Sequence, residues 1–239
     1  MIRRFFGYDI NQELTIQVFT WQHYTFIIVA LLTAILTLRY ANKVRNSKHE
    51  KTILNIVFFI LIGLESSYHI HNWLRYQFSV PLHLCSFSMI LSMLLLKTKN
   101  IKYFELLFFI GPLGGFTALV FPEMGGFTYL NFRYYSFIIS HLFIIAIPLY
   151  FYQSYGMRVN KQSLKKTYIF LISLLPVIYM VNRIFGMNYI FVNKKPKLEL
   201  VANNIPEWPY YLILFIVFAF SFIFTVYKVS NMRKFNEKY

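Results

Sequence analysis

The sequence has a single cysteine, few acidic residues and few charges of either sign. Only 14% of its 239 residues are charged, whereas 57% are hydrophobic and 21% are aromatic. One cysteine excludes an intramolecular disulfide and a zinc site built from several cysteines. So large an apolar fraction excludes a water-soluble domain of this length, and the composition therefore predicts a protein whose solvent is the lipid bilayer.

The shortage of acidic residues leaves a formal net charge of +15. A single basic stripe would indicate nucleic-acid binding, but Lys and Arg occur here in short runs between apolar stretches. That arrangement is typical of loops that flank transmembrane helices, so no nucleic-acid partner is expected. The first residues lack the basic, then apolar, then small-residue order of a cleaved signal peptide, and we expect the first hydrophobic segment to be retained.

Seven apolar segments approach the length that a membrane crossing requires, which is roughly 20 residues for a helix. They predict an all-α protein, a bundle of about seven transmembrane helices. With no linker and no internal repeat, we expect one domain over residues 1–239. The predicted spans are 20–38, 53–74, 80–96, 103–121, 134–152, 168–187 and 209–227.

Loop charge predicts the orientation of these spans. Sixteen of the 24 Lys and Arg residues fall on one side of the predicted bundle and eight on the other. Because basic residues concentrate in cytoplasmic loops, we predict an external N-terminus and a cytoplasmic C-terminus. The many Lys, Asn, Ile and Phe residues are typical of a bacterial source, and the expected location is the bacterial plasma membrane.

The fourth predicted span is interrupted by small residues and a proline, namely Gly111, Pro112, Gly114 and Gly115. Such a run allows either a helix kink or a close approach between neighbouring helices. We interpret it as a packing notch.

Ionisable groups inside a bilayer are costly, and each is a candidate functional residue. In the second predicted span, Glu65, His69 and Asn72 follow i, i+4, i+7 spacing and share one helix face. In the third, Ser79 is predicted to cap the helix and Pro81 to occupy its first turn.

Cys85 is a candidate nucleophile, and His141 is its candidate base. At about 1.5 Å per residue, Cys85 and His69 lie roughly 8 Å below the outer ends of their predicted spans, and His141 roughly 10 Å below. A thiol attacks as the thiolate, so it needs a base that takes its proton. His83 is two residues from Cys85 and would point about 200° away on a regular helix, which makes it a poor base.

Three other interpretations remain open. Cys85 could be a small residue that packs between helices. Glu65, His69, His83 and His141 are zinc-ligand types, although no pair has the HExxH form and no cofactor is predicted. In a non-enzymatic carrier or channel, Glu65, His69 and His141 would line a path for an ion, proton or solute. The nearly apolar inner halves of the spans favour a closed pocket over a path.

The outer loop between the sixth and seventh spans contains polar and basic residues that are candidates for contacting a phosphate head group. They are Asn182, Arg183, Asn188, Lys194 and Lys195.

Six stretches of the chain together resemble the YwaF-like bacterial integral membrane proteins, whose animal relative is the transmembrane protein 164 acyltransferase. They are LESSYHIHNW at 64–73, VPLHLCSF at 80–87, GPLGG at 111–115, FRYYSFIISH at 132–141, and MNYIFVNKKP with WPYY at 187–196 and 208–211. These stretches lie in the expected order over most of the chain.

The resemblance implies phospholipid chemistry. The animal relative moves a fatty acyl chain between phospholipids with a cysteine and a histidine, and the wider group resembles androgen-regulated lipid hydrolases that use a threonine and a histidine. By position, Cys85 would accept the acyl group and His141 would be the base. We expect a lipid acyltransferase or ester hydrolase that acts on membrane phospholipid. Its supporting residues would be Glu65, His69, Asn72 and His83.

Overall fold

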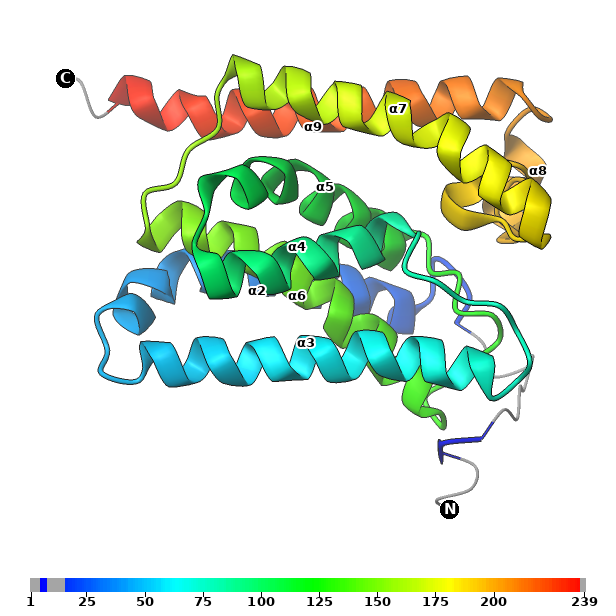
Figure 1. Ribbon diagram of the computed structural model, residues 1–239, viewed down its shortest axis with the longest axis horizontal. Helices are drawn as coiled ribbons and strands as arrows, with labels where there is room; N and C mark the ends of the chain where they lie inside the picture. The colour runs from blue at the N-terminus through cyan, green and yellow to red at the C-terminus, as the bar shows by residue number, and fades with distance from the viewer. Residues whose placement is uncertain (1–4, 8–15, 237–239) are drawn as a thin grey trace.

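The computed structural model describes residues 5–7 and 16–236, and within these ranges it is all-helical. Six helices are long and apolar enough to cross a membrane, and a seventh apolar helix is shorter. The chain is therefore a multi-pass membrane protein. In order, the elements are α2 (Trp21–Arg45), α3 (Glu50–Trp73), α4 (Leu84–Thr98), α5 (Ile101–Val120), α6 (Phe132–Ser154), α7 (Lys161–Phe185), the 3₁₀-helix η2 (Tyr189–Phe191), α8 (Glu199–Asn204) and α9 (Tyr210–Asn236) (Figure 1).

Each predicted span corresponds to one helix, and the helices differ from the predictions mainly at their ends. The clearest case is α7, which begins at Lys161 and not at 168. Asn160 caps it, accepting hydrogen bonds from the backbone N–H groups of Gln162 and Ser163, and the Ser163 hydroxyl completes a capping box. The helix therefore starts in a polar turn ahead of the apolar residues. The predicted external N-terminus lies largely outside the described residues.

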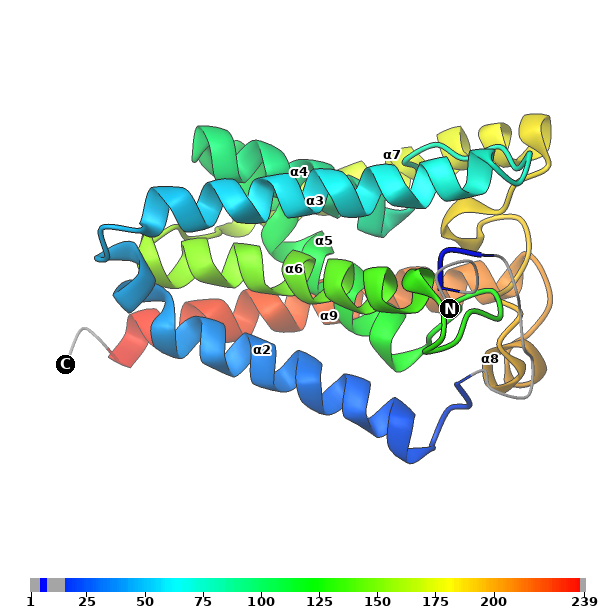
Figure 2. The ribbon, with the colours of Figure 1, turned by 90° about the horizontal axis from the view of Figure 1, so that it is seen from below.

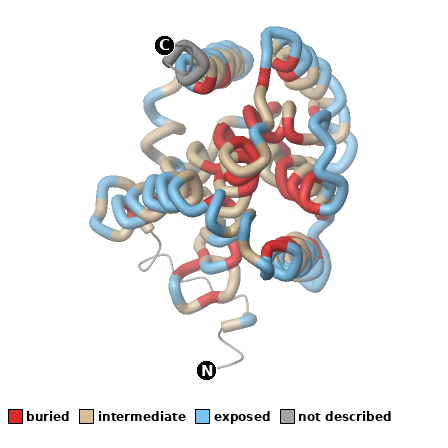
Figure 3. The backbone as a smooth tube through the Cα atoms, turned by 90° about the vertical axis from the view of Figure 1, so that its left-hand side faces the viewer, coloured by how far each residue is buried: buried red, intermediate tan, exposed pale blue. Residues whose placement is uncertain are grey.

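Helices α5 and α6 form the centre of the bundle. On one side α2 packs on both of them, α3 packs on α4 and α6, and α4 packs on both central helices, while α7 and α9 pack on the opposite side of α5 (Figures 1 and 2). Buried residues concentrate at this centre, and exposed residues lie mainly on the outer helices (Figure 3). Many of the exposed residues are large and apolar. An apolar exterior suits helices whose neighbours are lipid chains.

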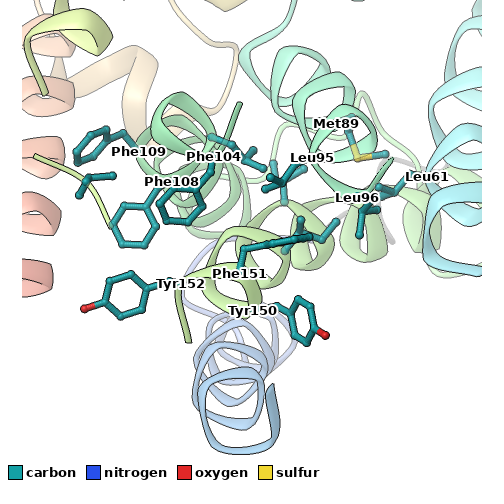
Figure 4. Close-up of a cluster of buried hydrophobic side chains, with 14 of the residues drawn as sticks. Leu61, Met89, Leu95, Leu96, Phe104, Phe108, Phe109, Tyr150, Phe151 and Tyr152 are labelled. Carbon is teal, nitrogen blue, oxygen red and sulfur yellow. The ribbon is translucent and has the colours of Figure 1, made fainter. Parts of the chain in front are cut away.

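The largest apolar cluster lies toward the ends of the helices that the α2–α3 and α4–α5 turns join. Leu61, Phe104, Phe109 and Phe151 are fully buried there (Figure 4). A buried carboxylate closes this end, because Glu50 accepts hydrogen bonds from Tyr150, Tyr155 and Arg45. The polar residues singled out from the sequence lie toward the opposite end.

Helix α4 begins later than the sequence indicates. Its first residue is Leu84, and its N-cap is His83, whose backbone is extended (φ −72°, ψ 152°). The predictions that Ser79 caps this helix and that Pro81 lies in its first turn are wrong. Residues 74–83 instead form an irregular segment, which holds the start of α4 well short of the C-terminal end of α3 (Figure 1). The cause is local: hydrogen bonds to α3 side chains occupy the Ser79 hydroxyl.

The glycine run of α5 is a packing notch within an unbroken helix. A Cβ atom at Gly111 would lie 2.5 Å from the carbonyl oxygen of Ile144, and one at Gly115 would lie 2.5 Å from Cγ1 of Ile145. Both contacts are shorter than real Cβ contacts, so only glycine lets α5 approach α6 this closely.

Candidate active site

Cys85 is the second residue of α4 and thus lies at a helix N-terminus. Its Sγ atom interacts with the backbone N–H groups of Cys85 and Ser86 and with the Ser86 hydroxyl. The side chain is partly buried. The first N–H groups of a helix have no carbonyl partner within it, and the helix dipole adds positive potential there. The N–H groups of this turn are therefore placed to donate to the sulfur and to a negative atom bound beside it.

His83 cannot be judged by the geometry of a regular helix, because it precedes α4. The expectation that it points about 200° away from Cys85 assumed that both residues lie in one regular helix, and that assumption is wrong. Its ring instead packs edge-on against Tyr189, with 4.9 Å between ring centroids.

His141 is buried in α6, and its orientation is set by its own helix. Nδ1 lies 2.6 Å from the carbonyl oxygen of Phe137. A carbonyl only accepts hydrogen bonds, so Nδ1 carries the proton and the lone pair of the neutral ring is on Nε2. This is the tautomer that a general base needs when it faces its substrate through Nε2.

Cys85 and His141 flank the same turn of α5. A Cβ at Gly114 would lie 3.9 Å from the backbone nitrogen of Cys85, and one at Gly115 would lie 3.0 Å from the carbonyl oxygen of His141. Both side chains also interact electrostatically with Glu65. No hydrogen bond joins Cys85 to His141 among the described residues, although both flank one turn of α5.

Glu65, His69 and Asn72 lie together in a hydrogen-bonded chain that includes Ser79. The Asn72 amide donates to Ser79 Oγ at 3.0 Å, Ser79 Oγ lies 2.8 Å from His69 Nδ1, and His69 Nε2 lies 3.2 Å from Glu65 Oε1. Because the carboxylate only accepts, Nε2 of His69 carries a proton and Nδ1 of the neutral ring accepts from Ser79. The chain fixes the Glu65 carboxylate beside the layer that contains Cys85 and His141.

A pocket of about 570 Å³ opens where α3, the 74–83 segment and the η2 loop meet. Cys85 and His141 do not line it, although His83, two residues before Cys85, does. The Tyr189 hydroxyl accepts a hydrogen bond of 3.1 Å from the Val80 N–H, which ties the η2 loop to the 74–83 segment. The lining residues are Tyr68, Asn72, Tyr76, Gln77, Phe78, Ser79, His83, Met187, Asn188 and Tyr189.

Of the five predicted head-group residues, the two asparagines build the loop itself. Asn182 is buried, donates to the carbonyl of Tyr189 and to the Asn193 side chain, and accepts from the Tyr189 N–H. Asn188 donates to the Lys194 carbonyl and accepts from the N–H groups of Asn193 and Lys194. Their hydrogen-bonding groups are thus occupied within the chain.

Of the three predicted basic residues, one is also bonded within the chain and two are not. Lys195 donates to the Ala202 carbonyl at 2.7 Å and pairs with Glu207 at 2.7 Å. Arg183 and Lys194 are exposed and line a second pocket of about 370 Å³ together with Trp208. Neither has an acidic partner among the described residues, so these two side chains are the ones available to an anion.

Sequence reasoning missed Arg133 and Tyr68. The Arg133 guanidinium lies 4.1 Å from the centre of the Tyr68 ring and 5.6 Å from that of Phe127. Tyr68 lines the larger pocket, and its hydroxyl interacts with Asn72 and Arg133. Arg133 also interacts electrostatically with Cys85. The available signal in the sequence is the arginine inside the FRYYSFIISH stretch at 132–141.

The zinc-ligand types singled out from the sequence are not gathered into one site. Among the residues that the structure describes, no three His, Cys, Asp or Glu side chains are grouped so that they could hold a metal ion.

Comparison with known proteins gives two matches. The model of the TMEM164 family matches residues 18–227, which include α2 to α7 and every candidate site residue. A protein of Treponema pallidum (strain Nichols), described as an uncharacterized protein, is 25% identical over 157 residues, or 66% of this chain. The match spans 65% of that relative, just under two thirds of its length. No solved structure matches.

Proposed function

The chain belongs to the TMEM164 family, and from that premise we propose that it is a membrane-embedded lipid acyltransferase, or lipid ester hydrolase, that forms an acyl-thioester on Cys85. The observation that carries the proposal is the place of Cys85 in the first turn of α4. There the nucleophile and a set of N–H donors lie at one point. An acyl-transfer site needs both, because the attacking sulfur and the carbonyl oxygen each become negative.

In the first half-reaction, Nε2 of His141 takes the proton from Sγ of Cys85, and the thiolate attacks the ester carbonyl of a phospholipid. The N–H groups of the first turn of α4 stabilise the oxyanion. The carbon–oxygen bond to the glycerol then breaks, and His141 returns the proton to the departing alkoxide. The products are a lysophospholipid and an acyl group bound to Cys85 through sulfur.

In the second half-reaction, the hydroxyl of a lysophospholipid, or water, attacks the thioester and passes its proton to His141. The carbon–sulfur bond breaks, and the Cys85 thiolate takes the proton back. The Glu65 carboxylate, fixed by His69, stabilises the imidazolium that exists while the proton is on His141. Arg183 and Lys194 would contact anionic head groups at the membrane surface.

The competing carrier or channel function receives less support from the packing. Toward the inner end, the layer of Glu65, His69 and His141 is followed by fully buried apolar residues such as Leu61 and Phe151. An ion would have to cross that cluster without a polar partner, at high cost. The arrangement favours a pocket that is closed at its inner end.

The test is to incubate the purified protein in lipid with a phospholipid that carries a labelled acyl chain, and to search for the label on Cys85 by mass spectrometry. We expect a hydroxylamine-sensitive adduct that is absent from His141→Ala. Adding lysophospholipid should move the label to a new phospholipid if the enzyme is a transferase. If the enzyme is a hydrolase, water should instead release the labelled acyl group as free fatty acid.

His23→Ala is the matched control, since His23 is another buried histidine, bonded to the Val120 carbonyl at 2.8 Å and remote from α4. His23→Ala should form the acyl adduct on Cys85 in proportion to the fraction of the protein that is folded. An unmodified Cys85, together with unchanged lipid turnover in Cys85→Ala, would contradict the thioester mechanism. Solute flux that is lost in Glu65→Gln and kept in Cys85→Ala would establish the carrier function in its place.

A further inference from the structure

Among the residues that the structure describes, Arg133 is a cation with no ion-paired carboxylate. It lies in the first turn of α6 and is partly buried. The described part of the chain contains ion pairs at Glu50, Glu65, Glu105 and Glu207, and none of them includes Arg133. Its neighbours are instead the rings of Tyr68 and Phe127.

Aromatic faces compensate only part of the free energy that a guanidinium loses when it leaves water. The attraction of a cation–π contact is much smaller than the free energy that desolvation of an ion costs. A buried arginine is therefore normally paired, and its five N–H donors match a carboxylate or a phosphate. The N-terminus of α6 adds positive potential at the same place. These features together select an anion.

The location of Arg133 indicates which anion. The first turn of α6 lies at the same end of the bundle as the polar pocket. Tyr68 lines that pocket, and the Arg133 guanidinium packs on the Tyr68 ring. Arg133 also interacts with Cys85. In a glycerophospholipid only the three-carbon glycerol separates the phosphate from the acyl esters, so a phosphate site must lie close to the nucleophile.

We propose that Arg133, supported by Tyr68, binds the phosphate of the donor phospholipid while one of its acyl esters lies at Cys85. This inference rests on the proposed function for the position of the ester at Cys85. Binding of the phosphate at Arg133 does not depend on acyl transfer and can be measured without it. It assigns the lipid phosphate to a partly buried arginine of α6, while the exposed Arg183 and Lys194 would contact head groups at the membrane surface. It also makes a phosphate-bearing lipid, and not a neutral glyceride, the substrate class.

Binding is tested first, in the Cys85→Ala background so that no lipid turns over. Photo-crosslinkable phosphatidylcholine and photo-crosslinkable diacylglycerol of equal chain length are the two probes. Arg133→Gln should weaken capture of the phospholipid by about tenfold or more, the loss expected when charged hydrogen bonds are removed, and leave diacylglycerol capture unchanged. Equal loss of both probes would indicate a structural role and overturn the proposal.

Turnover is tested second, with Cys85 intact. Arg133→Gln should raise KM for phospholipid about tenfold or more, while Cys85-dependent hydrolysis of a neutral fatty-acyl p-nitrophenyl ester persists. Arg133→Lys, which keeps the charge but loses the planar fork, should fall between wild type and Arg133→Gln and guards against misfolding of the latter. Arg39→Gln, at an exposed arginine of α2 outside the site, is the matched control for the substitution. If Arg183→Gln raises KM and Arg133→Gln does not, the proposal is wrong. If Cys85→Ala turns over lipid normally, the acyl-transfer function fails while the binding result stands.

Discussion

At the scale of single residues, Glu123 in the α5–α6 loop shows how burial and charge act on one carboxyl group. Its Oε1 accepts the backbone N–H of Lys197 at 3.3 Å, whereas its Oε2 is buried and has no hydrogen-bond partner among the described residues. Burial raises the pKa of Glu123 above the ordinary value of 4.5, and the Lys197 N–H and charge oppose this only in part. A raised pKa in the folded state means that the ionised form destabilises the fold.

The pH dependence follows from the sign of this shift. The contribution of Glu123 to stability is fully present below the ordinary carboxyl pKa of 4.5 and is lost as the pH rises through the folded pKa. Glu123→Gln should therefore raise the thermal unfolding midpoint at about pH 7–8 and lose that advantage near about pH 4. Glu207→Gln is the control, because 81% of that side chain is exposed. Parallel pH profiles for wild type and Glu123→Gln would contradict the argument.

Residue spacing predicts neighbours along one helix better than partners across a loop. The i, i+4, i+7 spacing of Glu65, His69 and Asn72 placed these residues on one face, where the structure has them in one hydrogen-bonded chain. Nothing in the sequence indicates that Asn182 bonds to Tyr189 across a turn, or that the Arg133 guanidinium lies on the Tyr68 ring. These pairings depend on tertiary folding and not on helical period.

At the scale of elements, the start of α4 is the part of the candidate site that the sequence could not give. An apolar run such as Val80-Pro81-Leu82 is compatible with a helix or with a buried irregular segment. The outcome depends on Ser79, which bonds to α3 side chains and so does not cap α4. The same difference moves Cys85 from a helix interior to a helix N-terminus, where its chemistry changes.

The notch in α5 predicts which of its glycines tolerate a methyl group. In Gly111→Ala the new Cβ would meet the Ile144 carbonyl oxygen at 2.5 Å, a backbone atom that cannot move without shifting α6. We expect a loss of about 1–3 kcal/mol in the free energy of unfolding. At Gly114 the nearest atoms are 3.9 Å away, an ordinary contact, so Gly114→Ala should be neutral or slightly stabilising. Unfolding by denaturant in mild detergent measures both.

Gly63→Ala is the control for the helix-propensity effect of the substitution, because nothing lies within 4 Å of a Cβ at Gly63 on α3. Its expected gain, up to about 1 kcal/mol, is the reference for the other two variants. Equal stability of Gly111→Ala and Gly63→Ala would mean that α5 and α6 are not in close contact in the membrane.

At the scale of the whole molecule, hydropathy was enough to predict an all-helical membrane protein, because a bilayer forces each apolar segment to satisfy its own backbone hydrogen bonds. Hydropathy could not predict that α5 and α6 occupy the centre, since α2, α7 and α9 are as apolar as the central helices. Nor could it predict that α4 is a short helix of 15 residues. A helix of that length rises only about 22 Å, less than the hydrocarbon thickness of a bilayer.

The orientation of the chain in the membrane decides whether the candidate site faces the outer or the cytoplasmic leaflet. Helix α3 joins two exposed positions at opposite ends, Lys48 just before it and Tyr76, which is 100% exposed, just after it. Because Cys85 is the sole cysteine, Cys85→Ala gives a cysteine-free background in which each position can carry a single new thiol. The positive-inside distribution predicts that a membrane-impermeant maleimide labels Tyr76→Cys on intact expressing cells and labels Lys48→Cys only after the membrane is opened. The reverse pattern would invert every span and place the pocket, Arg133 and Cys85 at the cytoplasmic leaflet. The phospholipid donor would then have to come from that side.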